Sequence, residues 1–181
     1  MSEDDATTED WVSGPHRVDS PHPDLTDGLA DLWGRVAAAG GAVGFGPADP
    51  VEELHAAAKA LVEDVTNKRV RLITLGKGHV LVGAVALRQQ WLPVQRHTAQ
   101  LLWLLVDPDL QGRGWEQQLH DAALAQAQAL GLEKLELSAR GGSELARLLE
   151  SNAWVERGRW PGAVRLVDGE EHDEVWFARD V

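Results

Sequence analysis

Apolar residues recur along the chain with two different spacings, and these spacings predict the secondary structure. Spacings of three and four positions indicate amphipathic helices, and they occur over four segments: residues 24–39, 50–65, 115–130 and 143–151. Shorter β-branched and apolar runs indicate strands, and there are six: residues 69–75, 79–91, 98–106, 132–138, 153–160 and 172–181. Turn signals at Gly76-Lys77-Gly78 and Asp168-Gly169 predict two hairpins. The mixed order of helices and strands predicts an α+β (α/β) fold.

The first 23 residues show neither spacing. They are rich in Asp, Glu, Ser, Thr and Pro and poor in apolar side chains, a composition that buries too little apolar surface to fold alone. We therefore expect a flexible acidic tail over residues 1–23. Residues 24–181 have the length of one domain, and no internal repeat divides them.

The segment between the strand at residues 98–106 and the helix at 115–130 is the most informative part of the chain. It carries the loop Gln111-Gly112-Arg113-Gly114. The first N–H groups of a helix have no partner within it, and the helix dipole adds partial positive charge at the same place. A glycine loop in front of a helix therefore predicts an anion site, although a plain strand–turn–helix joint has the same pattern. No Lys-Ser or Lys-Thr pair follows the glycines, so the loop is not a P-loop.

This segment resembles motif A of the GNAT acetyltransferases, V-x-P-x-x-(Q/R)-x-x-G-x-(G/A). Val106, Pro108, Gln111 and Gly114 match the motif, and Glu116 stands where the family has Gly or Ala. The order of elements is also the GNAT order. The resemblance implies a mixed, mostly antiparallel sheet of six or seven strands, splayed after the motif-A strand and flanked by about four helices.

Further segments resemble a small bacterial branch of the family that includes the tabtoxin-resistance acetyltransferase. The matching segments are Gly41-Ala42-Val43-Gly44-Phe45, Gly142-Ser143, Ala153-Trp154, Gly158 and Pro161-Gly162. Together with motif A, they extend the resemblance over residues 24–181, which would form a single GNAT domain.

The bulk composition restricts the classes of partner. The net charge is −12, so the chain lacks the broad basic field of a nucleic-acid binder. It has no cysteine, which excludes disulfides, thiol catalysis and Cys-ligated zinc, and its histidines show no metal-ligand spacing. No apolar run has the length of a membrane span, and no apolar signal segment follows Met1. We expect a cytoplasmic protein without a metal, a membrane or a nucleic-acid partner, and leave a homodimer open.

The resemblance implies that acetyl-CoA is bound as co-substrate. The backbone of Leu104 and Val106 would pair with the pantetheine arm, and Ser143 would lie beside that arm or act only as a helix N-cap. The residues expected at the pyrophosphate are Gln111, Gly112, Arg113, Gly114, Trp115 and Glu116. A carboxylate at position 116 would repel the pyrophosphate and weaken binding of the co-substrate.

The positions at which the related branch carries proton-transfer groups are occupied differently here. Gln100, Ser138, Leu149 and Ala163 replace a glutamate, an aspartate and two tyrosines, and none of the four titrates near neutral pH. His97 and Glu136 are the remaining candidates for acid–base work. Each is also explained as an exposed or salt-bridged side chain.

Two functions remain open from the sequence. The first is an acetyl-CoA-dependent N-acetyltransferase that acts on a small-molecule amine by direct transfer, with Phe45, Trp103 and Trp160 lining the acceptor site. The alternative is a catalytically degenerate GNAT-fold protein that binds a small ligand or a protein partner. The replaced proton-transfer positions favour the alternative, and the glycine loop favours the enzyme.

Overall fold

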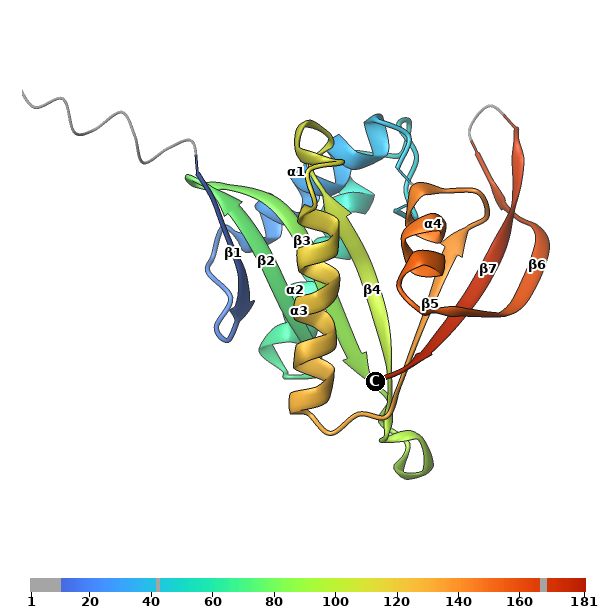
Figure 1. Cartoon of the computed structure of the whole chain (residues 1–181). Coiled ribbons are helices and arrows are strands. Elements are labelled where there is room, and N and C mark those ends of the chain that lie inside the picture. Colours follow the sequence, from blue (N-terminus) through green and yellow to red (C-terminus); the bar gives the residue numbers. More distant parts are fainter. Residues whose placement is uncertain (1–10, 42, 167–168) are drawn as a thin grey trace, which may run out of the picture.

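The computed structural model describes residues 11–41, 43–166 and 169–181, and it contains one mixed sheet with helices on both faces (Figure 1). The helices are α1 (Leu25–Ala38), α2 (Val51–Thr66), α3 (Trp115–Ala129) and α4 (Glu144–Ser151). The strands are β1 (Val12–Val18), β2 (Val70–Lys77), β3 (Val80–Gln89), β4 (Thr98–Val106), β5 (Lys134–Arg140), β6 (Val155–Arg165) and β7 (Glu171–Asp180). Two 3-10 turns, η1 (Pro93–Gln95) and η2 (Pro108–Leu110), flank β4. No helix in the described ranges is long and apolar enough to cross a bilayer.

The strands are ordered β1-β2-β3-β4-β5-β7-β6. All neighbours pair antiparallel except β4 and β5, which are parallel. The expected fold, a mostly antiparallel sheet of six or seven strands with four helices, is confirmed.

Successive apolar side chains of the central strands point to opposite faces of the sheet, and so form two hydrophobic cores. Ile73, Val85 and Leu87 pack with α3 and α4 on one face, whereas Leu72, Ala84 and Ala86 pack with α1 and α2 on the other. Both sets are buried because these strands are covered on both faces. Figure 1 shows α3 in front of the sheet, α1 and α2 behind it, and α4 beside β5.

The parallel strands β4 and β5 pair over only three residues. Thr98, Ala99 and Gln100 face residues 134–136, and no pairing continues beyond Gln100. The two strands therefore separate within the motif-A strand, after Gln100, and not at its end. A β-bulge lies just past this point, where Trp103 and Leu104 stand opposite Val85 and Trp103 has a φ of 49°. The bulge bends β4 beyond the point at which its pairing with β5 ends.

Strand β1 corrects the prediction of a tail over residues 1–23. Residues 12–18 pair antiparallel with β2 at the edge of the sheet, from Val12 opposite Lys77 to Val18 opposite Leu72. The polar sequence of this segment hid the strand, because an edge strand gains its stability from backbone pairing and needs few buried side chains. Residues 1–10 lie outside the described ranges, as does Asp168 of the predicted second hairpin turn.

An ion pair fastens α1 to the end of β4. The Arg35 Nε donates to Asp107 Oδ2 at 2.6 Å, and its Nη2 donates to the Leu81 carbonyl at 2.7 Å. The Asp107 side chain is 12% exposed, and its second oxygen accepts from the Asp109 N–H. These contacts hold the C-terminal part of α1 against the strand that leads into the glycine loop.

Replacing Asp107 by alanine should lower the free energy of unfolding by about 1–3 kcal/mol, because the partly buried guanidinium of Arg35 would lose its carboxylate partner. Urea denaturation followed by circular dichroism measures the change. Asp109→Ala is the matched control, because Asp109 is exposed and surface substitutions usually stay within about 0.5 kcal/mol. Equal stability of both variants would show that the ion pair adds nothing.

Candidate functional site

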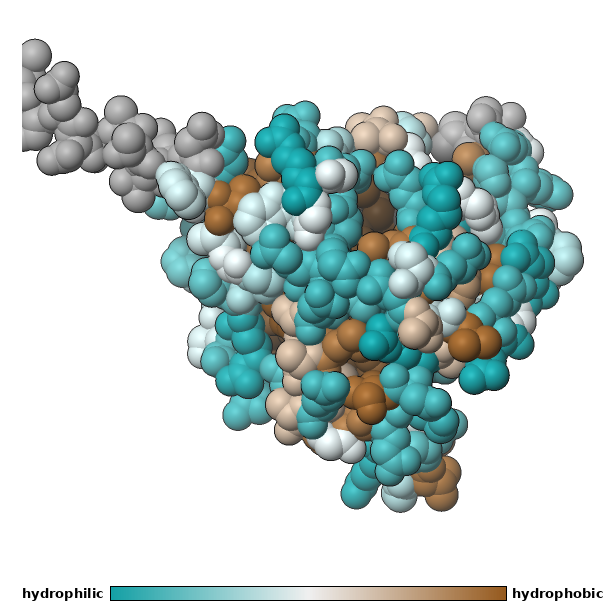
Figure 2. Space-filling model, viewed as in Figure 1, coloured by the Kyte–Doolittle hydropathy of each residue, from teal (hydrophilic) through white to brown (hydrophobic). Residues whose placement is uncertain are grey.

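A cleft of about 820 Å³ opens where β4 and β5 separate. Its walls come from the end of β4, the loop before α3, the end of β5, α4, and the segment that follows α1. In the space-filling view, the molecule is hollowed between the α3 and α4 regions, with apolar residues inside and hydrophilic residues at the rim (Figure 2). The lining residues are Val36, Ala39, Gly40, Gly41, Val43, Leu104, Val106, Gln111, Gly112, Glu116, Arg140, Ser143, Glu144, Leu145, Arg147, Leu148 and Ser151.

The loop before α3 has the backbone that an anion site needs. Gly112 and Gly114 have φ values of 70° and 86°, which side-chain-bearing residues rarely adopt. The helix begins at Trp115, and its first backbone donor inside the helix is the Gln118 N–H, which bonds to the Gly114 carbonyl. The N–H groups of Trp115, Glu116 and Gln117 are consequently available at the positive end of the helix dipole.

The cleft includes most of the residues expected around the co-substrate. Leu104, Val106, Gln111, Gly112, Glu116 and Ser143 line it, whereas Arg113, Gly114 and Trp115 do not. The Gln111 Nε2 donates to the Val106 carbonyl at 3.1 Å, so this carbonyl already has one partner. Ser143 is the N-cap of α4, and its Oγ accepts from the Ala146 N–H at 3.2 Å. The capping role expected for Ser143 is confirmed.

Two arginines in the cleft were missed by the sequence analysis. Arg140 ends β5, and its Nη2 donates to the Gly40 carbonyl at 3.1 Å; Arg147 lies on the exposed side of α4. They face a cleft that also contains Glu116 and Glu144. No local motif marks these arginines, because the rest of the cleft comes from the segment after α1 and the loop before α3, which are distant from them in the sequence.

The candidate proton-transfer residues are not gathered at the cleft. His97 is exposed before the first residue of β4, at the opposite end of that strand from the cleft-lining Leu104 and Val106. Glu136 is exposed on β5 and accepts from Gln90 Nε2 at 3.1 Å. Gln100 and Ser138 are half-buried on the same face as Glu136, the face that α1 and α2 cover elsewhere.

Leu149 is fully buried in the core shared with α3 and does not line the cleft. The neighbouring residues Leu148 and Ser151 line it instead. A tyrosine at position 149 would therefore have to displace core side chains before reaching the cleft, which makes this position a poor place to restore an acid.

Two of the three aromatic residues expected around an acceptor pack on one common ring, and the third lies on the edge strand β6. Phe45 and Trp103 each pack edge-on against the buried Trp33, with ring centroids 5.8 Å and 5.1 Å apart respectively. Trp160 lies on β6 and is 59% exposed. None of the three lines the cleft. Phe45 and Trp103 thus belong to the packing of α1 on the sheet, and a role of the three residues at an acceptor site stays a prediction.

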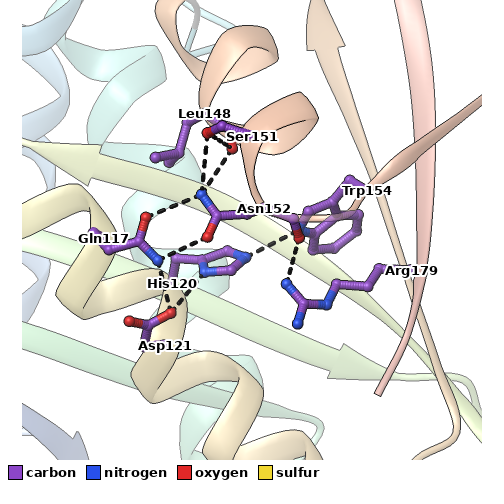
Figure 3. Close-up of polar contacts among 8 residues, drawn as sticks. All are labelled: Gln117, His120, Asp121, Leu148, Ser151, Asn152, Trp154 and Arg179. Carbon is purple, nitrogen blue, oxygen red and sulfur yellow. Dashed lines mark hydrogen bonds and ion pairs between the residues drawn. The ribbon is translucent and has the colours of Figure 1, made fainter.

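A polar network ties α3 to the end of α4 beside the cleft (Figure 3). Gln117 and Asn152 bond to each other reciprocally through their amides, at 2.8 Å and 3.0 Å. Asn152 Nδ2 also donates to the carbonyl of the cleft-lining Leu148 at 2.9 Å. Arg179 of β7 donates to the Asn152 carbonyl. Because Gln117 adjoins Glu116 and Asn152 adjoins Ser151, the network fixes the separation of two cleft walls.

His120 lies fully buried next to this network. Trp154 Nε1 donates to His120 Nε2 at 2.9 Å, and because an indole only donates, the imidazole proton resides on Nδ1. That nitrogen faces Asp121 Oδ1 at 3.1 Å. Burial lowers the pKa of the His120 imidazole, and the Asp121 carboxylate offsets only part of this effect while Arg179 adds to it. His120 is therefore a neutral, structural histidine at pH 7.

No metal site is formed within the described ranges by three or more His, Asp or Glu side chains.

Comparison with known families gives a match between residues 29–148 and the acetyltransferase (GNAT) family. No curated protein matches the sequence significantly.

Solved structures share the fold at low sequence identity. One is a "putative phosphinothricin N-acetyltransferase", with a TM-score of 0.76, 18% identity, and coverage of 94% of this chain and 98% of that one. Another is a ribosomal-protein-alanine N-acetyltransferase from Brucella melitensis, with a TM-score of 0.72, 14% identity and coverage of 92% and 99%. A third is yncA from Salmonella typhimurium, "a putative acetyltransferase" with its cofactor acetyl-CoA, with a TM-score of 0.69, 13% identity and coverage of 91% and 92%.

Acid should destabilise the protein through His120. Folding lowers the pKa of His120. The contribution of this histidine to the free energy of unfolding is therefore complete above the pKa of the unfolded chain, about 6.5, and is lost as the pH falls from there toward the lower pKa of the folded state. One such site changes the free energy of unfolding by at most about 1.4 kcal/mol per pH unit. Urea denaturation between pH 8 and pH 5 should show a shallower loss for His120→Gln than for the wild type. His79→Gln, in the exposed β2–β3 turn, is the control, and identical slopes for all three proteins would contradict the assignment.

Proposed function

The chain belongs to the acetyltransferase (GNAT) family, and from this premise we propose that it transfers the acetyl group of acetyl-CoA directly to a small-molecule amine. The proposal rests on one observation. The cleft between β4 and β5 extends to the N-terminus of α3, where backbone N–H groups have no partner within the helix. A splayed pair of parallel strands beside a glycine loop offers both a slot for an extended arm and a place for a pyrophosphate.

The residues present fit acetyl-CoA at most points. The backbone at Gly112 and the first turn of α3 would hold the pyrophosphate, and the exposed Arg113 is free to approach it. Leu104 and Val106 would border the pantetheine arm. Arg140 and Arg147 would supply positive charge on the opposite wall, and so offset the carboxylate of Glu116.

The proposed reaction needs a neutral amine. Its nitrogen attacks the thioester carbonyl carbon, the new C–N bond forms, and the C–S bond breaks to release CoA as a thiolate. The proton that leaves the nitrogen passes to water, and the thiolate takes up a proton from water. Gln100 and Ser138, which lie near the point where β4 and β5 separate, are unable to exchange protons near neutral pH. The chain would act mainly by positioning the two reactants.

The absence of titrating groups at these positions favours one alternative. A protein with the same cleft but no acetyl transfer would bind a small ligand or a protein partner. The two functions differ in a simple observation, because the enzyme releases CoA from acetyl-CoA in the presence of an amine and the binding protein does not.

Replacing Glu116 by alanine should tighten acetyl-CoA binding by about tenfold to a hundredfold. A like-charge pair at ~5 Å and an effective dielectric constant of ~20 costs about 3 kcal/mol before screening. Calorimetric titration gives the two dissociation constants, and the gain should shrink as salt is added.

Glu150→Ala is the matched control for this titration, because Glu150 is an exposed α4 residue outside the cleft lining and changes the net charge equally. Equal tightening of acetyl-CoA binding in both variants would show that the change in net charge, and not the position of Glu116, causes the effect. No binding of millimolar acetyl-CoA to any of the proteins would exclude the proposed function.

Acetyl transfer by the wild type should rise steadily with pH as the amine loses its proton, without an enzyme pKa between 6 and 7. Gln100→Glu would supply a base next to Glu136, its strand partner, and the like charge there raises the pKa of the new carboxyl. Turnover at pH 7 should increase about tenfold or more, since general bases typically contribute 10²–10⁴-fold. Thiol release measured across pH with a panel of amines tests this expectation.

Gln128→Glu is the control here, because Gln128 is exposed near the end of α3 and receives the same charge. A bell-shaped wild-type profile that His97→Ala or Glu136→Gln abolishes would show that one of these two residues is the base.

A further inference from the structure

A basic groove lies on the face of the sheet that α1 and α2 cover, beyond the C-terminal end of α2. It has a volume of about 580 Å³ and is bordered by Lys68, Arg69, Arg88 and Arg96, together with Trp91 and one carboxylate, Asp64. Four cations and one anion give the groove a net positive charge within a chain whose net charge is −12. Figure 1 shows that the end of α2 and the η1 loop lie at the same end of the sheet.

The cations of the groove are only partly neutralised. Asp64 lies 3.4 Å from Arg69 Nε and 3.2 Å from Arg88 Nη2, so one carboxylate serves two guanidinium groups. Lys68 and Arg96 are exposed, and within the described ranges neither has an acidic side chain within 4.0 Å. Trp91 is 79% exposed at the rim. The groove thus offers positive charge beside a flat apolar surface, and the Asp19 carboxylate, which pairs with Arg17, also interacts electrostatically with Lys68.

The backbone of Lys68 adds a second observation. Lys68 follows the C-cap of α2 with a φ of 58°, the left-handed conformation that usually selects glycine or asparagine at a helix end. Its N–H bonds to the Val65 carbonyl, and the Arg69 N–H bonds to the Asp64 carbonyl. Glycine and asparagine adopt this conformation with less strain than lysine, so the backbone at this helix end does not require a lysine.

The groove adjoins the point where the sheet opens. Arg88 is the strand partner of Gln100, the last residue of β4 that pairs with β5. Gln90, also at the groove, donates to Glu136, which is the partner of Gln100 on β5. The groove and the cleft share no lining residue, so an acceptor held in the groove would have to extend past Gln100 and Glu136 to reach the opening between β4 and β5.

We propose that the groove binds an anionic group, a carboxylate or a phosphate, carried by the amine acceptor. The proposal rests on the proposed function and specifies its substrate class: a molecule with a reactive amine at one end and a negative charge at the other. Lys68 and Arg96 would contact the anionic group, and Arg88 would hold it near the opening of the sheet. These residues determine specificity, and they take no part in bond making.

The test compares acceptors that differ only in the anionic group. ω-Amino carboxylates of increasing length and aminoalkyl phosphates are each paired with the alkylamine of equal length, and kcat and KM are measured for each. The anionic member of a pair should have a kcat/KM about tenfold or more above its neutral partner, mainly through KM. Added salt should reduce this ratio, and the two series show whether carboxylate or phosphate is preferred.

Lys68→Asn and Arg96→Gln should each lower the ratio about tenfold. Asparagine tolerates the left-handed backbone, so Lys68→Asn should keep or raise the thermal midpoint while it weakens the anionic acceptor. A residue with a merely structural role would not separate these two readouts. Lys59→Gln, an exposed change of equal charge elsewhere on α2, should keep the wild-type ratio. Equal kcat/KM for anionic and neutral partners, or a ratio that the groove variants leave unchanged, would overturn the proposal.

Failure of the proposed function has a different signature. If no amine in the panel is acetylated, acetyl transfer is excluded, and calorimetric titration of the full chain with the same amines decides the groove separately. Binding of an anionic amine that Lys68→Asn abolishes supports an anion site. Absence of any such binding to the wild type rejects it.

Discussion

The whole arrangement depends on the separation of β4 from β5 after Gln100. A parallel strand pair normally continues to exchange backbone hydrogen bonds along its length, and ending it after three residues requires a local cause. The local feature nearest to this point is the bulge at Trp103, whose left-handed backbone is unfavourable for a bulky residue. The edge-on contact of its ring with the buried Trp33 holds it there. The cleft, the exposed turn of α3 and the approach to Gln100 all follow from this one packed bulge.

The charges of the molecule are distributed unevenly around that opening. The chain as a whole is strongly acidic, yet arginines lie at the cleft and four cations border the groove beyond the end of α2. An acidic surface repels anions at long range, whereas local cations attract them within about a Debye length of 10 Å. The protein thus combines an acidic surface with two places where cations gather. Selectivity for the right anion then depends on geometry more than on net charge.

The sequence predicted those parts of the fold in which local spacing and tertiary packing agree. Strand β4 was predicted at its observed bounds, and the four helices begin and end within one or two residues of their predicted positions, because each carries a clear apolar face. Strand β1 was missed because an edge strand with few buried residues leaves no periodic signal. The same limit applies to the site. The loop at Gln111–Gly114 is a local motif. The approach of Arg140 and Arg147 to that loop, and the basic groove, bring together segments far apart in the chain, which no spacing rule connects.

The end of α1 is attached to both sides of the opening. Arg35 bonds to Asp107 at the end of β4, and Arg140 at the end of β5 bonds to the carbonyl of Gly40, just past the helix. These two contacts connect the end of α1 and the residues just after it to both strands, and so hold the β4 wall and the β5 wall of the cleft at a fixed separation. If these two contacts keep the walls in place, little conformational entropy is lost when a ligand enters, and affinity then depends on contacts and charges rather than on a closing motion.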